Sequence, residues 1–213
     1  MWRLSRAACR PEWQTGVTSL EAALRQIGAD LTRAHVSFAV VGGLAVSVRT
    51  EPRFTRDADL AVALATDAEA EALIRELRAH DYRIEAIVEQ TATGRLATVR
   101  LMFSSEPRAP VIDLLFASSG IEPEVVADAE SIELLPNLTM GVAQTGHLIA
   151  LKVLSRDDIG RPQDLVDLRA LLRVASPAEL GRARDSLALI AARGYHRGRE
   201  LMSEMNALLP LVP

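Results

Sequence analysis

The stretch VVGGLAVSVRTEPRFTRDADLAV, residues 40–62, carries most of the information about the fold. It starts at the end of an apolar run that predicts a buried strand, and a turn is expected at Gly42 and Gly43. It ends in alternating residues that predict a second strand, with Asp57 and Asp59 on one face and apolar side chains on the other. A pair of acidic side chains is therefore expected on a sheet, shortly after two glycines.

The acidic pair has two interpretations. Two like charges side by side are unfavourable, so Asp57 and Asp59 need a compensating positive charge. A magnesium ion would supply it, because Mg²⁺ takes carboxylate oxygens and bridges to substrate phosphates. The simpler interpretation is a solvated strand face on which the two acids pair with the nearby Arg53 and Arg56.

Other residues around this pair favour a metal and phosphate site. Gly42 and Gly43 would let backbone amides approach a polyphosphate, and the hydroxyl of Ser47 could add a contact, although an ordinary tight turn also explains the glycines. Asp113 interrupts the apolar run VIDLLFAS, where an unpaired charge is costly to bury. Three carboxylates on adjacent strands could hold two metal ions about 4 Å apart and support in-line phosphoryl displacement.

The composition indicates a globular, core-forming protein. The 213 residues are 49% hydrophobic, 24% charged and only 4% aromatic, so the core is expected to be aliphatic. A net charge of −4 argues against a protein coated with positive charge, but it allows a local basic groove. No apolar run predicts a membrane span or a secretory signal, and the single cysteine, Cys9, fits a cytoplasmic location.

Periodicity divides the chain into an irregular leader at 1–16, an α+β part at 17–143 and a helical part at 144–213. Capping boxes predict helix starts at Thr18 with Glu21 and at Thr66 with Glu69. Strands are expected within 36–41, 54–64, 82–90, 95–103, 111–118 and 131–143, and short helices at 44–50 and 121–130. The helical part is expected to contain helices at 147–158, 162–174, from 176 onward, and at 196–208.

The stretch 40–62 resembles the signature of the nucleotidyltransferase superfamily, to which DNA polymerase beta belongs. In that signature, Gly-Gly or Gly-Ser follows a hydrophobic residue, and Asp-hydrophobic-Asp comes about a dozen residues later. The spacer here, residues 44–56, is at the long end of the usual range, and Ala58 is a small occupant of the hydrophobic position. The string Arg53-x-Thr55-x-Asp57-x-Asp59 is similar more specifically to the AbiEii/AbiGii-type toxin nucleotidyltransferases.

A later segment strengthens this resemblance. ALKVLSRDDIGRPQDLVDLRALL, residues 150–172, is similar to the helical motif of that family, in which an aspartate follows a lysine by a dozen or more residues. The lysine is Lys152, and the aspartate is Asp164 or Asp167, which the spacing does not decide. Without the resemblance, Lys152 would be interpreted first as a surface lysine with a buried stem, and His147 as a structural residue.

The resemblance covers residues 35–175 and implies an α+β nucleotidyltransferase fold, a mixed sheet with flanking helices followed by a helical C-terminal part. It implies that Gly43 and Ser47, with Gly42 beside them, contact the triphosphate of an NTP. It also implies that Asp57 and Asp59 bind Mg²⁺ or Mn²⁺ and that Asp113 completes the triad or acts as a base. Lys152 would bind phosphate, with one of the two helical aspartates beside it.

The implied reaction transfers a nucleoside monophosphate from an NTP, expected to be a pyrimidine nucleotide, to an RNA hydroxyl and releases pyrophosphate. The expected acceptor is the 3′ end of tRNA, so the protein would be a toxin that blocks translation, with a cognate antitoxin as partner and no DNA or membrane partner. Phosphorylation of Thr55 would place negative charge beside the metal ligands and is expected to switch the activity off, a control that the resemblance to some family members implies. Candidate contacts to acceptor phosphates are Arg49, Arg53, Arg56, Arg95 and Arg100.

Two alternatives stay open at this point. The first is a nucleotidyltransferase that modifies a small molecule such as an aminoglycoside, whose positive charge would suit the acidic chain. The second is a non-catalytic module that binds a nucleotide or a protein partner. The presence of all three carboxylates disfavours this second alternative.

Overall fold

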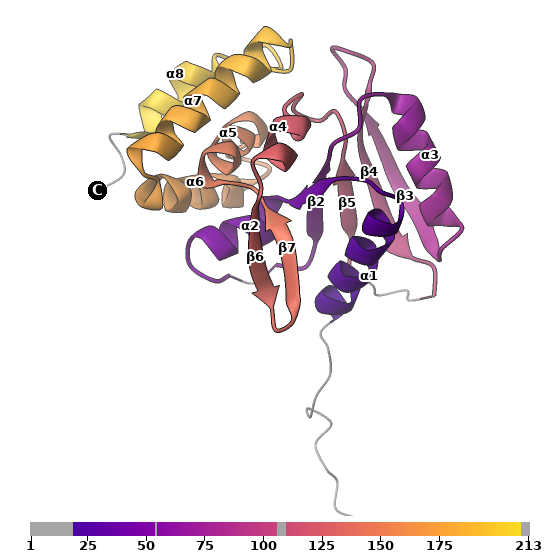
Figure 1. The fold of residues 1–213 in the computed structure, drawn as a ribbon. Coiled ribbons are helices and arrows are strands. Elements are labelled where there is room, and N and C mark those ends of the chain that lie inside the picture. Colours follow the sequence, from indigo (N-terminus) through magenta and orange to yellow (C-terminus); the bar gives the residue numbers. More distant parts are fainter. Residues whose placement is uncertain (1–18, 54, 106–109, 210–213) are drawn as a thin grey trace, which may run out of the picture.

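The structure, a computed structural model, describes residues 19–53, 55–105 and 110–209. Within these residues the chain forms a mixed seven-stranded sheet with flanking helices and a helical C-terminal part, which confirms the expected α+β class (Figure 1). The expected leader at 1–16, Cys9 and the Thr18 half of the first capping box lie outside the described residues.

The sheet brings the two signature strands together at its centre. Its strands are β1 (Phe38–Val40), β2 (Ala58–Val62), β3 (Tyr82–Glu89), β4 (Leu96–Phe103), β5 (Ile112–Leu115), β6 (Glu130–Leu135) and β7 (Leu138–Val142). Their order is β3-β4-β5-β2-β1-β7-β6. β2 is parallel to β5 and β1 is parallel to β7, whereas the other neighbouring strands are antiparallel.

Two helices, α1 (Ser19–Arg33) and α3 (Asp67–Arg78), lie against one face of the sheet (Figure 1). The apolar side chains of α1 recur at helical period, and Leu24, Ile27 and Leu31 among them are fully buried against the sheet, while Leu20 is partly buried. The capping box that opens α3 is confirmed, because the Thr66 hydroxyl accepts from the Glu69 backbone N–H and the Glu69 carboxylate accepts from the Thr66 backbone N–H. The core that these helices share with the sheet is almost entirely aliphatic.

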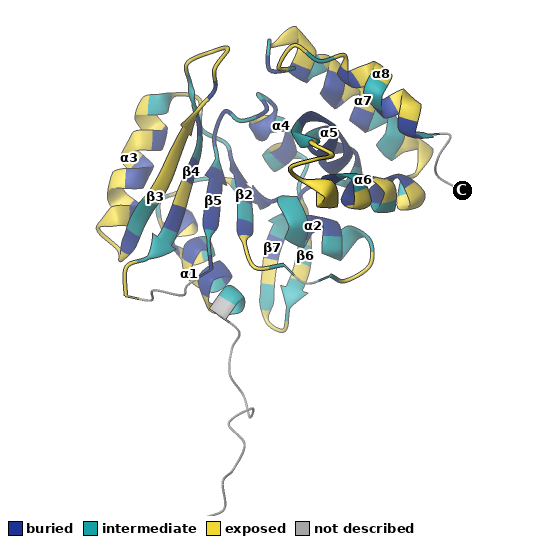
Figure 2. Ribbon diagram, turned by 180° about the vertical axis from the view of Figure 1, so that it is seen from behind, coloured by how far each residue is buried: buried dark blue, intermediate teal, exposed yellow. Residues whose placement is uncertain are grey.

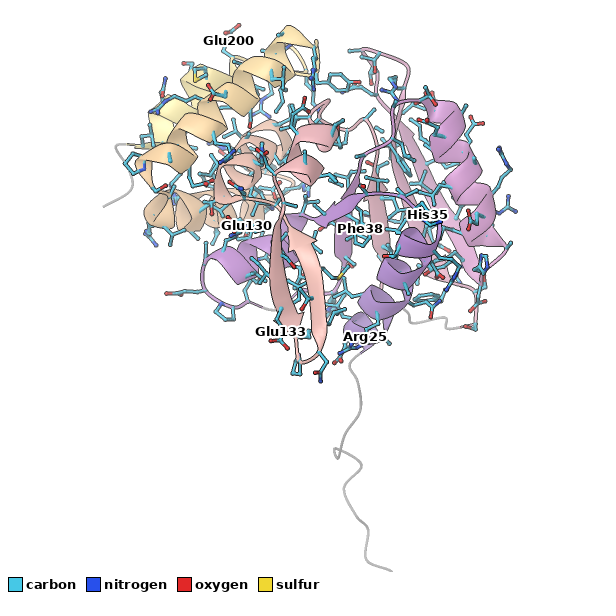
Figure 3. All side chains as sticks on the ribbon, viewed as in Figure 1. Arg25, His35, Phe38, Glu130, Glu133 and Glu200 are labelled. Carbon is cyan, nitrogen blue, oxygen red and sulfur yellow. The ribbon has the colours of Figure 1, made fainter. Side chains whose placement is uncertain are left out.

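The β6–β7 hairpin is attached to α1 at its tip. Arg25 of α1 donates to the backbone carbonyl oxygens of Pro136 and Asn137, at 2.7 and 2.9 Å (Figure 3). At its base, Arg49 pairs with Glu130 of β6. These bonds hold the far edge of the sheet, away from the acidic strands.

The remaining helices are α2 (Gly42–Arg49), α4 (Glu122–Ala127), α5 (Thr145–Ser155), α6 (Pro162–Val174), α7 (Pro177–Ala192) and α8 (Leu201–Leu208). α2 packs against β2 and also against α5 and α6, so it joins the sheet to the C-terminal helices. Seen from behind, the β3 end of the sheet has no helix over its second face, and most of β3 is exposed (Figure 2). None of the helices in the described part of the chain is long and apolar enough to cross a membrane.

Several element boundaries differ from the sequence predictions; α5, for example, ends at Ser155 and not at 158. α2 begins at Gly42 itself, so the glycines form the first turn of the helix and not a separate turn before it. β2 begins at Ala58, because its partners β1 and β5 pair only with residues 58–62, and Asp57 and Thr55 therefore lie in the segment that leads into it. α8 begins at Leu201 and not near 196, because Arg197 and Gly198 have positive φ angles, which interrupt a helix.

Candidate active site

A row of charged side chains crosses three neighbouring strands. Asp59 of β2 lies in register with Asp113 of the parallel strand β5, and Asp113 lies in register with Arg100 of the antiparallel strand β4. Because registered residues project from the same face of a sheet, the three side chains stand next to one another. Residues that are up to 54 positions apart in the sequence, 59 and 113, are thus brought together by strand pairing alone.

These side chains line a cavity of about 950 Å³ between the sheet and the C-terminal helices. The cavity brings together nine of the ten residues predicted to form the site. They are Gly42, Gly43, Thr55, Asp57, Asp59, Asp113, Lys152, Asp164 and Asp167. The α+β part supplies the first six of these residues and the helical part supplies the last three.

Ser47 is the predicted residue that does not line the cavity. It lies one turn along α2, and its hydroxyl is hydrogen-bonded to the backbone carbonyl oxygens of Gly43 and Arg53, at 3.0 and 3.3 Å. In this structure Ser47 holds the segment after α2 close to the helix. Among the predicted arginines, Arg49 and Arg95 also lie outside the cavity and pair with Glu130 and Asp67.

Gly42 is required at its position for two reasons. Its φ angle of +61° lies in the left-handed region that favours glycine, and a Cβ atom there would lie 1.9 Å from Oδ2 of Asp59. The backbone of the first turn of α2 therefore lies directly against the Asp59 carboxylate. The Gly43 backbone N–H forms a hydrogen bond to the same carboxylate, so this glycine positions Asp59 as well.

The electrostatic environment of Asp59 calls for a cation. The pKa of Asp59 is raised to about 6, mainly by burial and then by the negative charge of Asp113, while Lys152 acts in the opposite direction. Asp57, which is exposed at the start of β2, also raises this pKa. The site thus contains more negative charge near Asp59 than its own lysine offsets.

Asp113 is held by Arg100. The guanidinium donates from Nε and Nη2 to the two carboxylate oxygens of Asp113, at 2.9 and 2.7 Å, and the hydrogen bond raises the pKa of Arg100. Asp113 is buried, while the Arg100 side chain is about half exposed to the cavity. The sequence suggested Arg100 only as a contact to acceptor phosphate, because its register with Asp113 depends on a pairing that periodicity does not show.

Lys152 lies at the centre of a buried ion network. Its Nζ atom is 2.7 Å from Asp164 and 2.8 Å from Asp167, and all three side chains are almost fully buried. The spacing in the sequence left open whether Asp164 or Asp167 accompanies the lysine, and in the structure both do. A surface lysine with a buried stem is excluded, since the Lys152 side chain is only 11% exposed.

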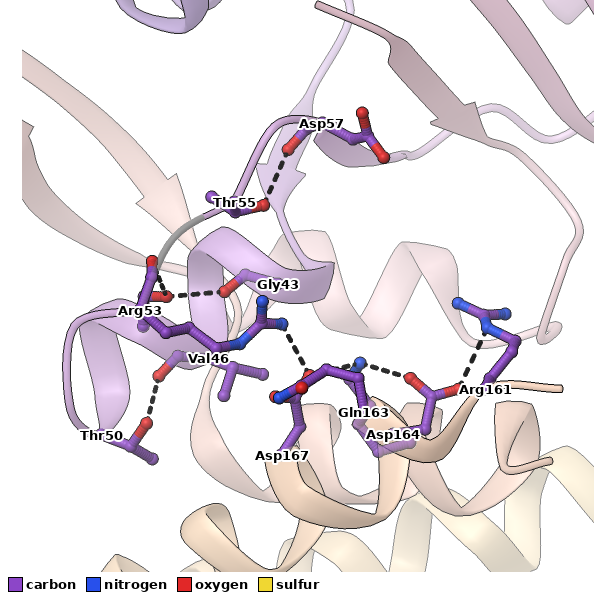
Figure 4. Close-up of polar contacts among 12 residues, drawn as sticks. Gly43, Val46, Thr50, Arg53, Thr55, Asp57, Arg161, Gln163, Asp164 and Asp167 are labelled. Carbon is purple, nitrogen blue, oxygen red and sulfur yellow. Dashed lines mark hydrogen bonds and ion pairs between the residues drawn. The ribbon is translucent and has the colours of Figure 1, made fainter. Parts of the chain in front are cut away.

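Arg53 and Arg161 extend this network toward the rest of the cavity (Figure 4). Arg53 donates to Asp167 at 2.8 Å and so connects the segment before β2 to α6. Arg161 lies 3.3 Å from Asp164 at the start of α6. The Thr55 hydroxyl donates to the Asp57 backbone carbonyl at 3.4 Å, which places it beside the acidic pair (Figure 4).

The donor set fits a magnesium ion bound together with a phosphate substrate. Among the described residues, no three carboxylate, histidine or cysteine side chains converge as a cage around one point. Mg²⁺ seldom uses such a cage and is commonly held by one or two carboxylates plus substrate oxygens. Asp57 and Asp59 supply that minimal set next to the first turn of α2, and a cation there would offset the negative charges of Asp113 and Asp57, which add to the effect of burial in raising the pKa of Asp59.

His147 is not part of this cavity. Its ring nitrogens contact Ser186 at 3.0 Å and Asp128 at 3.1 Å, between α5 and α7. The sequence analysis interpreted this histidine as structural, and the structure places it outside the cavity that contains Asp57, Asp59 and Asp113. Arg197, Ser118 and Ser119 do line the cavity, although no sequence pattern indicated them.

One family model matches most of the chain. The model of a family described as "Nucleotidyl transferase AbiEii toxin, Type IV TA system" matches residues 23–212. Among curated proteins, none matches this sequence.

Two solved structures share the fold. An antigenic nucleotidyltransferase-like protein from Paracoccidioides brasiliensis is 18% identical, with 89% of this chain and 93% of that chain covered and a TM-score of 0.50. The structure of ANT(2")-Ia in complex with adenylyl-2"-tobramycin is 15% identical, with 82% and 97% covered and a TM-score of 0.51. At these identities the likeness concerns the fold alone.

Proposed function

Because the chain belongs to the nucleotidyl transferase AbiEii toxin family of type IV toxin–antitoxin systems, we propose that it transfers a nucleoside monophosphate from an NTP to RNA. The observation that carries this proposal is the convergence of Asp57, Asp59, Asp113 and Lys152 on one cavity, beside a helix start that has no room for a side chain. We propose the 3′ end of tRNA as the acceptor and a pyrimidine NTP as the donor.

Mg²⁺ or Mn²⁺, when bound by Asp57 and Asp59, would offset charge on the triphosphate and lower the pKa of the acceptor hydroxyl. Because Gly42 has no side chain, the first turn of α2 lies directly against the Asp59 carboxylate, and a side chain at Gly43 would instead meet Arg53, at 2.7 Å from Nη2. Gly43 also fixes the orientation of Asp59 through its backbone N–H. These contacts prepare the carboxylates before substrate binds, which lowers the cost of assembling the site.

Lys152 supplies positive charge from the helical wall of the cavity. Asp164 and Asp167 hold its ammonium group in place, and Arg53 and Arg161 balance the two aspartates from outside. We assign Lys152 to the triphosphate, where a fixed positive charge stabilises the leaving pyrophosphate. The cavity is lined by residues from both 17–143 and 144–213. This supports our division of the chain into a catalytic part and a helical part that form the site together.

We assign Asp113 to the acceptor side of the reaction. It would add a third carboxylate for the metal or accept the proton of the attacking hydroxyl. Both oxygens of Asp113 accept hydrogen bonds from Arg100. In either role, Asp113 would therefore bind the metal or the proton while it is still paired with that arginine. Arg100 in turn is positioned to contact a phosphate of the acceptor.

RNA is favoured over an aminoglycoside by the charge of the cavity wall. Five arginines and Lys152 line the cavity together with five aspartates, and a metal ion on Asp57 and Asp59 would leave the wall positive, which would attract RNA phosphates and repel a polyamine. The test incubates the protein with each α-labelled NTP and Mg²⁺, together with tRNA, total RNA without tRNA, or a panel of aminoglycosides. Label in the tRNA 3′ end supports the proposal, whereas label only in an aminoglycoside would refute it.

We propose two forms of regulation, an antitoxin and a phosphorylation. We propose that a cognate antitoxin controls this protein, as expected of a toxin in a type IV system. We also propose that phosphorylation of Thr55 inhibits transfer, because its hydroxyl lies beside Asp57 and a phosphate there would add negative charge at the metal ligands. Thr55→Glu is expected to lose most activity while Thr55→Ser keeps it; full activity of Thr55→Glu would contradict this.

A further inference from the structure

A second row of side chains lies next to the charged row on the same face of the sheet. Val88 of β3 is in register with Thr98 of β4, and Thr98 is in register with Leu115 of β5. Each residue is two positions from a member of the row Ala86, Arg100 and Asp113, so the two rows share a face. All three side chains line the cavity that contains the carboxylates. We call Val88, Thr98 and Leu115 the β3–β5 platform.

The platform is a largely apolar surface inside the cavity. Val88 is 53% exposed although it is a branched aliphatic residue, and Leu115 is only partly buried. No helix covers this part of the sheet (Figure 2). Single exposed aliphatic residues are common, but an apolar surface that continues across three strands into a cavity is typical of a binding site.

Arg197, from the segment between α7 and α8, lines the same cavity. Its guanidinium makes one long hydrogen bond, 3.4 Å to the backbone carbonyl of Ser118, and it forms no ion pair with a carboxylate in the described part of the chain. Burial, with Arg199 and Arg161 nearby, lowers the pKa of Arg197. The charge of Glu122 acts in the opposite direction on this pKa. An exposed arginine that lies near other arginines and has no carboxylate ion pair among the described residues is suited to an anionic ligand.

The strand order indicates which substrate reaches this surface. Gly42 lies against Asp59 on the β1 side, and Asp113, Arg100 and the platform follow on the other side, because β2 lies between β1 and β5. In an in-line displacement, the attacking and leaving oxygens occupy opposite sides of the reacting phosphorus. With pyrophosphate leaving on the side of Gly42 and Lys152, the acceptor hydroxyl has to approach from the side of the platform.

We propose that the β3–β5 platform and Arg197 form the acceptor subsite, which binds the terminal nucleoside of a single-stranded RNA. The base and ribose pack on Val88 and Leu115, Thr98 offers a hydroxyl between them, and Arg197 contacts a phosphate of the acceptor strand. Single-stranded nucleic acids are bound in this way, by a surface for the bases and positive charge for the backbone. The inference rests on the proposed function, since it takes RNA to be the acceptor.

The test uses the full chain and a short 5′-labelled single-stranded RNA with a free 3′ hydroxyl. Val88→Ser is expected to weaken RNA binding about five-fold, because it removes apolar burial. Arg197→Gln is expected to reduce the slope of log affinity against log salt concentration by about 0.7, the value for one lost phosphate contact on a single strand. Both variants should bind Mg²⁺–NTP like wild type and raise the KM for RNA more than they change kcat.

Matched controls are Ile87→Ser and Arg184→Gln. Ile87 is 57% exposed on the same strand but does not line the cavity, and Arg184 is an exposed residue of α7 that does not line it either. The controls should keep wild-type RNA affinity and salt slope. Unchanged RNA binding in Val88→Ser and Arg197→Gln, or equal losses in the controls, would overturn the subsite.

Other outcomes separate this inference from the proposed function. A loss of NTP affinity in Val88→Ser would show that the platform holds the base of the donor nucleotide, and it would also overturn the inference. If the wild type labels RNA but both variants keep its KM, only the acceptor subsite is refuted. If the wild type labels no RNA and binds none, the proposed RNA acceptor is refuted and the subsite with it.

Discussion

Substitution of Gly42 by alanine is expected to displace the Asp59 carboxylate and nearly abolish transfer. The new Cβ would lie 1.9 Å from Asp59 Oδ2, about 1.5 Å short of ordinary van der Waals contact, and 2.7 Å from the Asp59 Cβ. Because the side chain is close along its whole length, rotation of the carboxylate alone does not relieve the overlap. A displacement of about 1 Å at a reacting group commonly lowers the rate on the order of 100-fold.

The stability of the protein should fall as well. An alanine at the φ angle of +61° costs about 1–2 kcal/mol, before any cost of the overlap with Asp59. Gly94→Ala is the matched control, because Gly94 has a φ angle of +66° and nothing within 4 Å of its added Cβ. The difference between the two variants therefore isolates the contact with Asp59 from the backbone strain that they share.

The assay compares kcat/KM for nucleotide transfer and the urea midpoint of unfolding in both variants. We expect Gly94→Ala to lose stability but to keep transfer near the wild-type rate, and Gly42→Ala to lose about 100-fold in kcat/KM. Equal kcat/KM values for the two variants would refute the reasoning, because they would show that the closeness of Gly42 to Asp59 has no part in activity.

Two further predictions concern buried charges. Lys152→Met leaves Asp164 and Asp167 with only their arginine partners, so the free energy of unfolding should fall by about 3 kcal/mol in urea titrations; an unchanged midpoint would contradict the buried network. Burial raises the pKa of Asp30, but hydrogen bonds, including that from Tyr82 at 2.8 Å, outweigh it and keep the pKa below its usual value. The ionised Asp30 thus stabilises the fold above about pH 4. Asp30→Asn should cost about 1–2 kcal/mol at neutral pH. That difference should vanish as the pH falls below the lowered pKa, and a constant or growing difference in acid unfolding would argue against the assignment.

The sequence predicted the local elements of the site well. The helix start at the glycine pair, the strand with Asp59 and the capping box at Thr66 are encoded by neighbouring residues, and the structure contains these elements with shifted bounds, which leave Asp57 just before the strand. Asp113 was singled out because a charge inside an apolar run needs a partner, and the structure supplies Arg100. Such arguments work when the physical cause lies within a few residues of its effect.

The pairings between distant segments could not be predicted. The contact of Arg100 with Asp113 depends on the register of β4 against β5, and that of Arg53 with Asp167 depends on how α2 packs against α6. Both aspartates of α6 reach Lys152 because the lysine is buried between them, and spacing alone had suggested one of the two. Tertiary packing, which has no local signature, decided each of these contacts.

Ser47 shows the limit of carrying a motif over by position. Its hydroxyl was expected at the triphosphate, but it is bonded to the carbonyl oxygens of Gly43 and Arg53 and lies outside the cavity. A hydroxyl one turn into a helix readily bonds to a carbonyl of the preceding turn, so its distance in sequence from Gly43 did not fix its direction. In our proposal the phosphate side of the site is therefore assigned to Gly42, Gly43 and Lys152.

We propose that metal-dependent nucleotide transfer depends on Asp57 and Asp59. Asp57→Asn tests it most directly, because Asp57 is exposed and its replacement should leave the fold intact. Wild type and Asp185→Asn, a change at an exposed aspartate outside the cavity, should transfer labelled nucleotide to RNA with Mg²⁺ or Mn²⁺ and stop when EDTA is added. Asp57→Asn should transfer none under the same conditions, and transfer at the wild-type rate by Asp57→Asn would contradict the account.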